Sequence, residues 1–142
     1  MRVLFLCTGN SCRSQMAEGW ARHFWAGRIE AESAGTRPKG LDPLAVGAMQ
    51  EAGVDISGQA SKGLDAVNGR HFDLVITVCS DADENCPLFP GAPKVVHAGF
   101  DDPPGLAKSA RSREEAIAHY RRVRDEIREF IKRLPEILEK GS

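Results

Sequence analysis

Short runs of apolar residues recur along the chain, each bounded by polar or glycine-containing segments. Val3-Leu4-Phe5-Leu6 and Leu74-Val75-Ile76 are the clearest runs, and such runs are typical of strands buried on both faces. Two weaker patterns lie around Ile29 and Val95. The chain is therefore predicted to form four strands, over residues 2–6, 28–33, 73–78 and 94–98.

Between these runs, apolar residues recur at helical spacing or polar segments follow a capping residue. Helices are predicted over residues 14–25, 43–52, 80–86 and 110–142. Asp42 should cap the second helix, with Pro43 at its first position, and Gly53 should end it. Pro135 should kink or end the last helix. The segments rich in glycine or proline are predicted to be irregular, over residues 34–41, 54–72, 87–93 and 99–109.

Apolar strands that alternate with helices favour a parallel sheet covered on both faces. We predict a single α/β domain over residues 1–142, a flavodoxin-like three-layer sandwich with a four-stranded parallel sheet in the order 2-1-3-4 and helices on both faces. Ligands of such folds bind beyond the carboxyl ends of the strands. Cys7, Cys79 and the loop around Asp102 all follow predicted strands.

Composition excludes several classes of protein. With 142 residues, 42% of them hydrophobic and 27% charged, the chain has the composition of a globular domain and not of a disordered one. Its 19 basic and 20 acidic residues give no basic excess, which disfavours nucleic-acid binding. No apolar run approaches the ~18 residues of a membrane span, and no signal peptide is evident. We expect a monomeric cytoplasmic protein that binds neither nucleic acid nor membrane.

The chain has four cysteines, Cys7, Cys12, Cys79 and Cys86. In a reducing cytoplasm, cysteines are seldom structural disulfides and are more often reactive, metal-bound or buried. Their surroundings therefore decide the function.

Cys7 and Arg13 enclose a polar loop between a predicted strand and a predicted helix. Such a loop can curl its backbone N–H groups around a tetrahedral oxyanion, and the positive end of the following helix adds to the attraction. Arg13 can bind two oxyanion oxygens side by side. Gly9 can adopt backbone angles that other residues avoid, and Asn10 tolerates the left-handed region. The candidate oxyanion-binding residues are Thr8, Gly9, Asn10, Ser11, Cys12 and Arg13.

The same positive field favours the thiolate form of Cys7, and Ser14 is placed to donate a hydrogen bond to its sulfur. Cys12 remains open: it is either a small buried residue of the loop or a second redox group.

With this loop and several motifs elsewhere, the sequence resembles the low-molecular-weight tyrosine phosphatase superfamily, and more closely its thioredoxin-coupled arsenate reductases. The resemblance covers nearly the whole chain, and the segment from Cys79 to Cys86 is specific to the reductases. The motifs that carry it are Cys7 to Arg13 with Ser14-Gln15-Met16-Ala17-Glu18-Gly19-Trp20, Ser33-Ala34-Gly35, Val78-Cys79-Ser80-Asp81-Ala82-Asp83 with Cys86-Pro87, and Gly99-Phe100-Asp101-Asp102-Pro103.

The resemblance implies a relay of three cysteines. Cys7 attacks arsenate, Cys79 then attacks Cys7 and releases arsenite, and Cys86 attacks Cys79 to leave a disulfide that thioredoxin reduces. Along an intact helix, Cys79 and Cys86 would lie about 10 Å apart, whereas a disulfide needs Cα atoms within roughly 7 Å. The segment would therefore have to unwind. A zinc site and two unreactive buried cysteines are the alternatives for this pair.

The resemblance also assigns Asp102 as the general acid, with Asp101 the less favoured neighbour. Some of these reductases bind potassium near the loop, and Asn10, Glu18 and Ser33 match that site. Lys62 stands where an aspartate would complete it. Because an ammonium group can replace the ion, we expect no potassium requirement. We also expect no metal and no bound cofactor, since the four histidines form no cluster with metal-ligand spacing and the reducing equivalents come from thioredoxin.

Two other functions stay open. A low-molecular-weight tyrosine phosphatase needs Cys7, Arg13 and Asp102 only, but usually has tyrosines after the Asp-Pro pair, where this chain has Pro104 and Gly105. A non-catalytic thiol protein that binds arsenite or zinc needs neither Arg13 nor Asp102. For the reductase, phosphate and sulfate should compete with arsenate, and a weak phosphatase activity is expected.

Overall fold

A computed structural model of the chain describes residues 1–67, 69–78 and 94–140. The short helix predicted over residues 80–86, and with it Cys79 and Cys86, lies outside the described residues.

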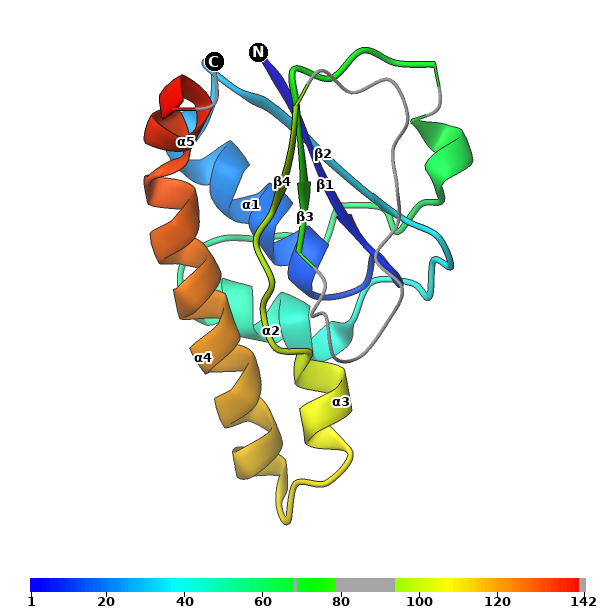
Figure 1. The fold of residues 1–142 in the computed structure, drawn as a ribbon. Coiled ribbons are helices and arrows are strands. Elements are labelled where there is room, and N and C mark those ends of the chain that lie inside the picture. Colours follow the sequence, from blue (N-terminus) through cyan, green and yellow to red (C-terminus); the bar gives the residue numbers. More distant parts are fainter. Residues whose placement is uncertain (68, 79–93, 141–142) are drawn as a thin grey trace.

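The centre of the fold is a parallel sheet of four strands: β1 (Arg2–Cys7), β2 (Glu30–Gly35), β3 (Leu74–Thr77) and β4 (Val95–His97). Their order is β2-β1-β3-β4, which confirms the predicted order 2-1-3-4. The second strand lies two residues later than predicted, because Ala34 and Gly35 pair with Leu6 and Cys7. Figure 1 shows β1 in the middle of the sheet, with its carboxyl end beside the start of α1.

The helices are α1 (Arg13–Trp25), α2 (Pro43–Glu51), α3 (Pro103–Ala107), α4 (Arg113–Lys132), α5 (Leu134–Lys140) and the short 3-10 helix η1 (Leu64–Ala66). Asp42 caps α2 as predicted, since its carboxylate accepts a hydrogen bond from the backbone N–H of Leu44. Gly53 follows with a φ of 89°, a left-handed conformation that ends the helix.

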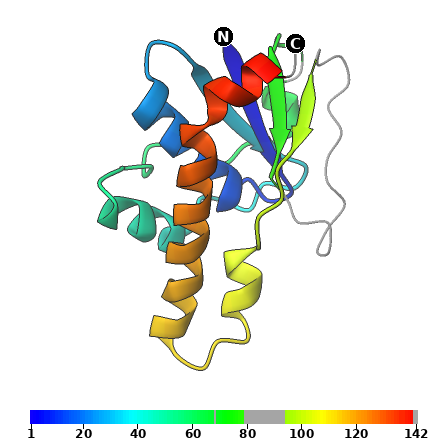
Figure 2. The same ribbon diagram turned by 60° about the vertical axis from the view of Figure 1, so that its left-hand side comes forward.

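Alternation along the strands divides the core between the two faces of the sheet. Val3 and Phe5 belong to the larger cluster, with residues of α1 and α4 such as Trp20 and Ile127. Leu4 and Leu6 point to the opposite face, where they pack in a smaller cluster with residues that include Val67, Phe72 and Val75. Figure 2 shows α1, α2 and α4 gathered on the first of these faces.

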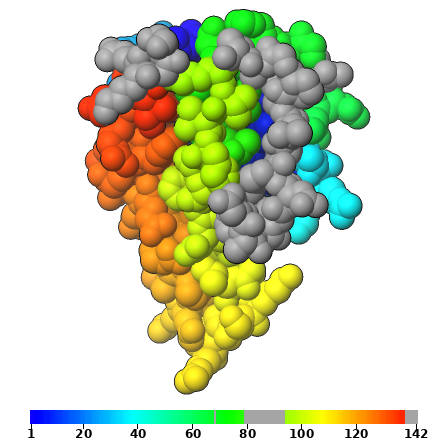
Figure 3. All heavy atoms as spheres, in the orientation of Figure 1, coloured from blue at the N-terminus to red at the C-terminus, as the bar shows by residue number. Residues whose placement is uncertain are grey.

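Two predicted segments differ from what the structure shows. The loop expected over residues 99–109 contains α3, because Pro103 occupies a first-turn position, where its missing N–H costs nothing. The segment expected to be irregular over residues 54–72 contains η1. In Figure 3, α3 and the turn after it project beyond the sheet at the narrow end of the molecule.

The last predicted helix is divided into α4 and α5, as expected from Pro135. Proline has no N–H to donate to the carbonyl four residues earlier, which here is that of Ile131. The indole N–H of Trp25 donates to the Ile131 carbonyl instead, at 2.8 Å. Among the described residues, no helix is long and apolar enough to cross a membrane.

Candidate active site

Cys7 is the last residue of β1 and is 3% exposed. It borders a pocket of about 130 Å³ at the carboxyl end of the sheet, well below the ~300 Å³ at which pockets for drug-sized ligands begin. The pocket is lined by Cys7, Thr8, Gly9, Ser11, Cys12, Arg13, Lys39, Asp42, Asp102 and Pro104. Its size and polar lining suit a small anion.

The backbone of the loop is held from outside through its carbonyl groups. Thr8, Gly9 and Ser11 accept hydrogen bonds from the backbone N–H groups of residues 37, 39 and 42, at 2.9, 2.9 and 3.1 Å. The carbonyl of Asn10 accepts from the Gln15 side chain at 2.9 Å. Because a carbonyl and the next N–H point in opposite directions, the N–H groups of residues 9–12 are turned away from these donors. Successive backbone N–H groups left on one side of a loop in this way can bind an anion.

Gly35 allows this bracing by its lack of a side chain. A Cβ at this position would lie 2.5 Å from the carbonyl oxygen of Thr8 and 2.7 Å from that of Cys7. Both are backbone atoms, so neither can move aside without distorting the loop. The glycine is part of the Ser33-Ala34-Gly35 motif, and close approach of two backbones explains it.

Asn10 holds the inside of the loop. It is fully buried and has a φ of 44°, which confirms the expected left-handed conformation. Its Oδ1 accepts from the backbone N–H of Lys62 at 2.8 Å, and its Nδ2 donates to Ser14 Oγ at 2.8 Å. The unusual backbone angles expected at Gly9 are not found, since its φ is not positive.

Ser14 lies beside the sulfur of Cys7, with Oγ and Sγ 3.2 Å apart. Because Asn10 already donates to the Ser14 oxygen, the hydroxyl proton of Ser14 is available to the sulfur. The contact predicted from the sequence is therefore present, with a direction that suits a thiolate. Thr8 Oγ1 is buried without a hydrogen-bond partner among the described residues, so this hydroxyl can serve a ligand.

Arg13 brings the β4–α3 connection to the loop. Its side chain is 5% exposed. One guanidinium nitrogen donates to the carbonyl of Phe100 at 3.2 Å, and another lies 3.6 Å from Asp102 Oδ1. Asp101 instead pairs with Arg122 on the surface at 3.0 Å. The structure therefore places Asp102, and not its neighbour, at the pocket.

This combination of fold and loop has a known counterpart. Residues 2–142 match the family model described as low molecular weight phosphotyrosine protein phosphatase. The chain belongs to this family.

The proteins that are similar to this chain include arsenate reductases. The chain is 52% identical to an arsenate reductase of Bacillus licheniformis, over 94% of each sequence. A solved arsenate reductase in the phosphate-binding state is 32% identical, with a TM-score of 0.78 over 99% of this chain and 98% of that one. A thioredoxin-dependent arsenate reductase of Corynebacterium glutamicum is 27% identical, with a TM-score of 0.65 over 97% of this chain and 61% of that one.

Cys12 differs from Cys7 in its surroundings. It is buried at the N-terminus of α1. Burial, and then the negative charge of Asp42, raises the pKa of the Cys12 thiol well above its usual value. Cys12 is therefore held protonated, which favours the interpretation of a small buried loop residue over that of a second nucleophile.

Three further residues of this family member reach the pocket without being predicted to do so: Lys39, Asp42 and Pro104. Asp42 was assigned only as a helix cap. The Tyr120 hydroxyl also donates to Asp42 Oδ2 at 2.6 Å. Burial, and then this hydrogen bond, raises the pKa of the Tyr120 phenol. In the sequence, only the positions of Lys39 and Asp42 after the second strand indicated that these residues could lie at the pocket.

The residues that match the potassium site are satisfied by protein groups. Ser33 donates to Glu18 Oε1 at 2.6 Å, and Arg22 pairs with Glu18 Oε2 at 2.9 Å. Burial raises the pKa of Glu18. The ammonium of Lys62 lies 3.5 Å from Glu32, so its ion pair is with this neighbouring carboxylate. Within the described ranges, no group of three or more His, Cys, Asp and Glu side chains is placed to hold a metal ion.

Cys79 and Cys86 lie outside the described residues. The last described residue before Cys79 is Val78, whose backbone N–H donates to the carbonyl of Leu6 at 2.9 Å. Val78 therefore lies beside β1, the strand that ends in Cys7.

Proposed function

We propose that this chain reduces arsenate to arsenite through three cysteines and that thioredoxin returns it to the reduced state. The observation that carries the proposal is Cys7 at an anion-sized pocket beside the guanidinium of Arg13, in a chain 52% identical to an arsenate reductase. Its chemistry follows from the residues around that pocket.

Arsenate binds with its oxygens against the N–H groups of residues 8–13 and the guanidinium of Arg13. The thiolate of Cys7 attacks arsenic and forms a sulfur–arsenic bond. Asp102 gives a proton to the departing oxygen, which leaves as water. The Ser14 hydroxyl stabilises the thiolate before the attack, when Cys7 carries the full negative charge.

The thiolate of Cys79 then attacks the sulfur of Cys7. A Cys7–Cys79 disulfide forms, the sulfur–arsenic bond breaks, and its electron pair stays on arsenic, which is thereby reduced from As(V) to As(III). Cys86 attacks Cys79 and releases Cys7 as a thiolate. The dithiol of thioredoxin reduces the Cys79–Cys86 disulfide and restores both thiols.

The electrons come from thioredoxin, so the proposal requires no bound cofactor or metal. Phosphate and sulfate compete with arsenate because they share its tetrahedral geometry. The monomeric state and the cytoplasmic location, where thiols are kept reduced, belong to this proposal as well.

Family membership also supports a weak phosphatase activity, for which Cys7, Arg13 and Asp102 suffice. None of the described residues that line the pocket is aromatic, so among them no ring is positioned to stack on a phosphotyrosine. Tyr120, the one tyrosine of the chain, is buried in α4. Arsenate reduction therefore remains the proposed main activity.

The deciding experiment follows NADPH consumption with thioredoxin, thioredoxin reductase and arsenate. Wild type should consume NADPH only when arsenate is present. Cys79→Ser should abolish this turnover yet keep the hydrolysis of p-nitrophenyl phosphate, whereas Cys7→Ser should abolish both. NADPH consumption by Cys79→Ser at the wild-type rate would overturn the relay.

A further inference from the structure

Lys39 is an exposed residue in the connection between β2 and α2, yet it lines the pocket of Cys7. Its backbone N–H donates to the carbonyl of Gly9 at 2.9 Å. Its Cδ, Cγ and Cε atoms lie 3.2, 3.5 and 3.7 Å from the position that a Cβ on Gly9 would take. The alkyl chain thus lies along the loop, across the one residue that has no side chain to obstruct it.

This packing explains the glycine better than backbone conformation does, since the φ of Gly9 is not positive. A side chain at position 9 would press against Lys39. With Gly9, the lysine is held at its backbone N–H and along its methylene groups, and the side chain lies where Lys39 lines the pocket. In the part of the chain that the structure describes, no carboxylate lies within salt-bridge distance of Lys39.

The other charges at the pocket make a second cation necessary. Arg13 lies beside Asp102, at 3.6 Å, and the carboxylate of Asp42 lines the same pocket. Two aspartates and one arginine therefore line this pocket, and the Asp42 carboxylate also accepts hydrogen bonds from Leu44 and Tyr120. A tetrahedral oxyanion of this kind is present near pH 7 as both the singly and the doubly charged form, and the doubly charged form gains most from a second cation.

We infer that Lys39 is an anion-binding residue of this site: its ammonium pairs with an outward oxygen of a bound tetrahedral dianion, opposite the oxygens held by Arg13 and the loop. In this inference, Arg13 and Lys39 have different roles. Arg13 is a buried, rigid fork that fixes orientation, whereas Lys39 is a flexible point charge at the mouth that favours capture. The inference rests on the proposed function, which requires a dianion at Cys7.

The test is calorimetric titration of the reduced protein with inorganic phosphate, because binding is measured without the relay. Lys39→Met keeps the alkyl stem over Gly9 and removes the charge. It should raise the Kd for phosphate about tenfold at low salt, the size expected for a charge near the surface facing a dianion. The difference should shrink in 0.5 M KCl, where screening is strong.

Two variants control the interpretation. Lys39→Arg should bind phosphate nearly as wild type does, because it restores the charge. Lys108→Met removes another exposed lysine, one that is not among the residues lining the pocket, and it should not change the Kd. In the arsenate assay, Lys39→Met should raise KM and leave kcat nearly unchanged.

Unchanged phosphate affinity in Lys39→Met would overturn the inference, as would an equal loss in Lys108→Met, which would indicate only the overall field of the protein. If the wild type fails to reduce arsenate while Lys39→Met still weakens phosphate binding selectively, the proposed function fails and the role of Lys39 stands.

Discussion

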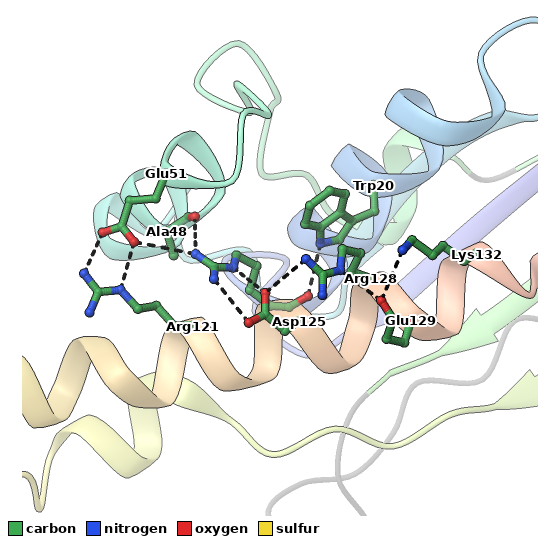
Figure 4. Close-up of polar contacts among 9 residues, drawn as sticks. Trp20, Ala48, Glu51, Arg121, Asp125, Arg128, Glu129 and Lys132 are labelled. Carbon is green, nitrogen blue, oxygen red and sulfur yellow. Dashed lines mark hydrogen bonds and ion pairs between the residues drawn. The ribbon is translucent and has the colours of Figure 1, made fainter.

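Two polar networks in this protein differ in burial and in kind. The network under the loop joins Asn10, Ser14 and Gln15, all fully buried, through neutral amides and a hydroxyl. The network on α4 joins charged side chains such as Glu51 and Arg121 at the surface (Figure 4). The buried groups have no water to replace a lost partner, whereas the surface ions do. The buried network therefore fixes the geometry of the loop, whereas the surface network contributes little to the geometry of α4.

Ion pairs occur in the surface network and not among the three neutral residues under the loop. Figure 4 shows the Glu51 carboxylate between two arginines and a chain of pairs through Asp125 to Glu129. The same view shows Trp20, whose indole donates to the carbonyl of Arg124 at 3.1 Å. This neutral contact from α1 is partly buried and joins two helices, so we expect it to contribute more than any one exposed ion pair.

The largest effect is expected at Arg13. Arg13→Lys keeps the charge but loses the two-pronged contact with an oxyanion. Removal of one well-placed donor at a reacting oxyanion costs about 10²–10³ in rate, and we expect a loss of that size in arsenate-dependent NADPH consumption. Turnover near that of wild type in Arg13→Lys would contradict the role of Arg13 as a clamp.

Gly35 should show the next effect, through the loop. Gly35→Ala places a Cβ 2.5 Å from the Thr8 carbonyl, and such overpacking costs about 1–3 kcal/mol. Urea unfolding should report the lost stability, and phosphate titration should report weaker binding. Gly47→Ala is the control: it lies within α2 with open space around it, so it should stabilise by about 0.5–1 kcal/mol. Equal behaviour of the two variants would refute the close approach at position 35.

Cys12 tests the neutral state of the buried loop. With its pKa raised by burial and by Asp42, Cys12 should react with iodoacetamide much more slowly than Cys7 near pH 8. Asp42→Asn removes one cause of the raised pKa, so it should speed the labelling of Cys12 several-fold. Peptide mass mapping separates the two cysteines. Labelling of Cys12 as fast as Cys7 in the wild type would contradict the raised pKa of the Cys12 thiol.

The smallest effect is expected on α4. Glu51→Gln breaks the paired contacts with Arg121 at 2.8 Å, but both side chains lie in solvent, so the urea midpoint at pH 7 should barely fall. Arg121 lowers the pKa of Glu51, so the stabilisation is present above the ordinary Glu pKa of about 4.3 and is lost as the pH falls below it. Near pH 2, the urea midpoints of Glu51→Gln and the wild type should be the same. A large loss at pH 7 would reverse the contrast between the networks.

The sequence predicts well what local patterns determine. The order of strands, the loop from Cys7 to Arg13 and the left-handed Asn10 follow from apolar runs, spacing and backbone preference. The α3 helix was missed because Pro103, Pro104 and Gly105 favour a turn unless the first proline falls at a helix start.

What the sequence does not predict is set by contacts between distant segments. The backbone N–H groups of residues 37, 39 and 42 bind loop carbonyls that lie 29 to 31 positions earlier in the chain, and the composition of residues 37–42 does not predict these contacts. Lys39 in particular is an ordinary exposed lysine until the fold lays it across Gly9. Asp42 is recognisable as a cap, because capping is local, but its place at the pocket depends on the packing of α2 beside α1.

The hydrogen bond from the Trp25 indole to the Ile131 carbonyl joins α1 to the end of α4. While Pro135 is present, no backbone N–H at position 135 can donate to that carbonyl, and Trp25 supplies the hydrogen bond at 2.8 Å. The same carbonyl also accepts from the backbone N–H of Arg133 at the end of α4. The Trp25 indole therefore adds a connection between α1 and the end of α4, and replacing Trp25 would remove that connection without leaving the carbonyl alone.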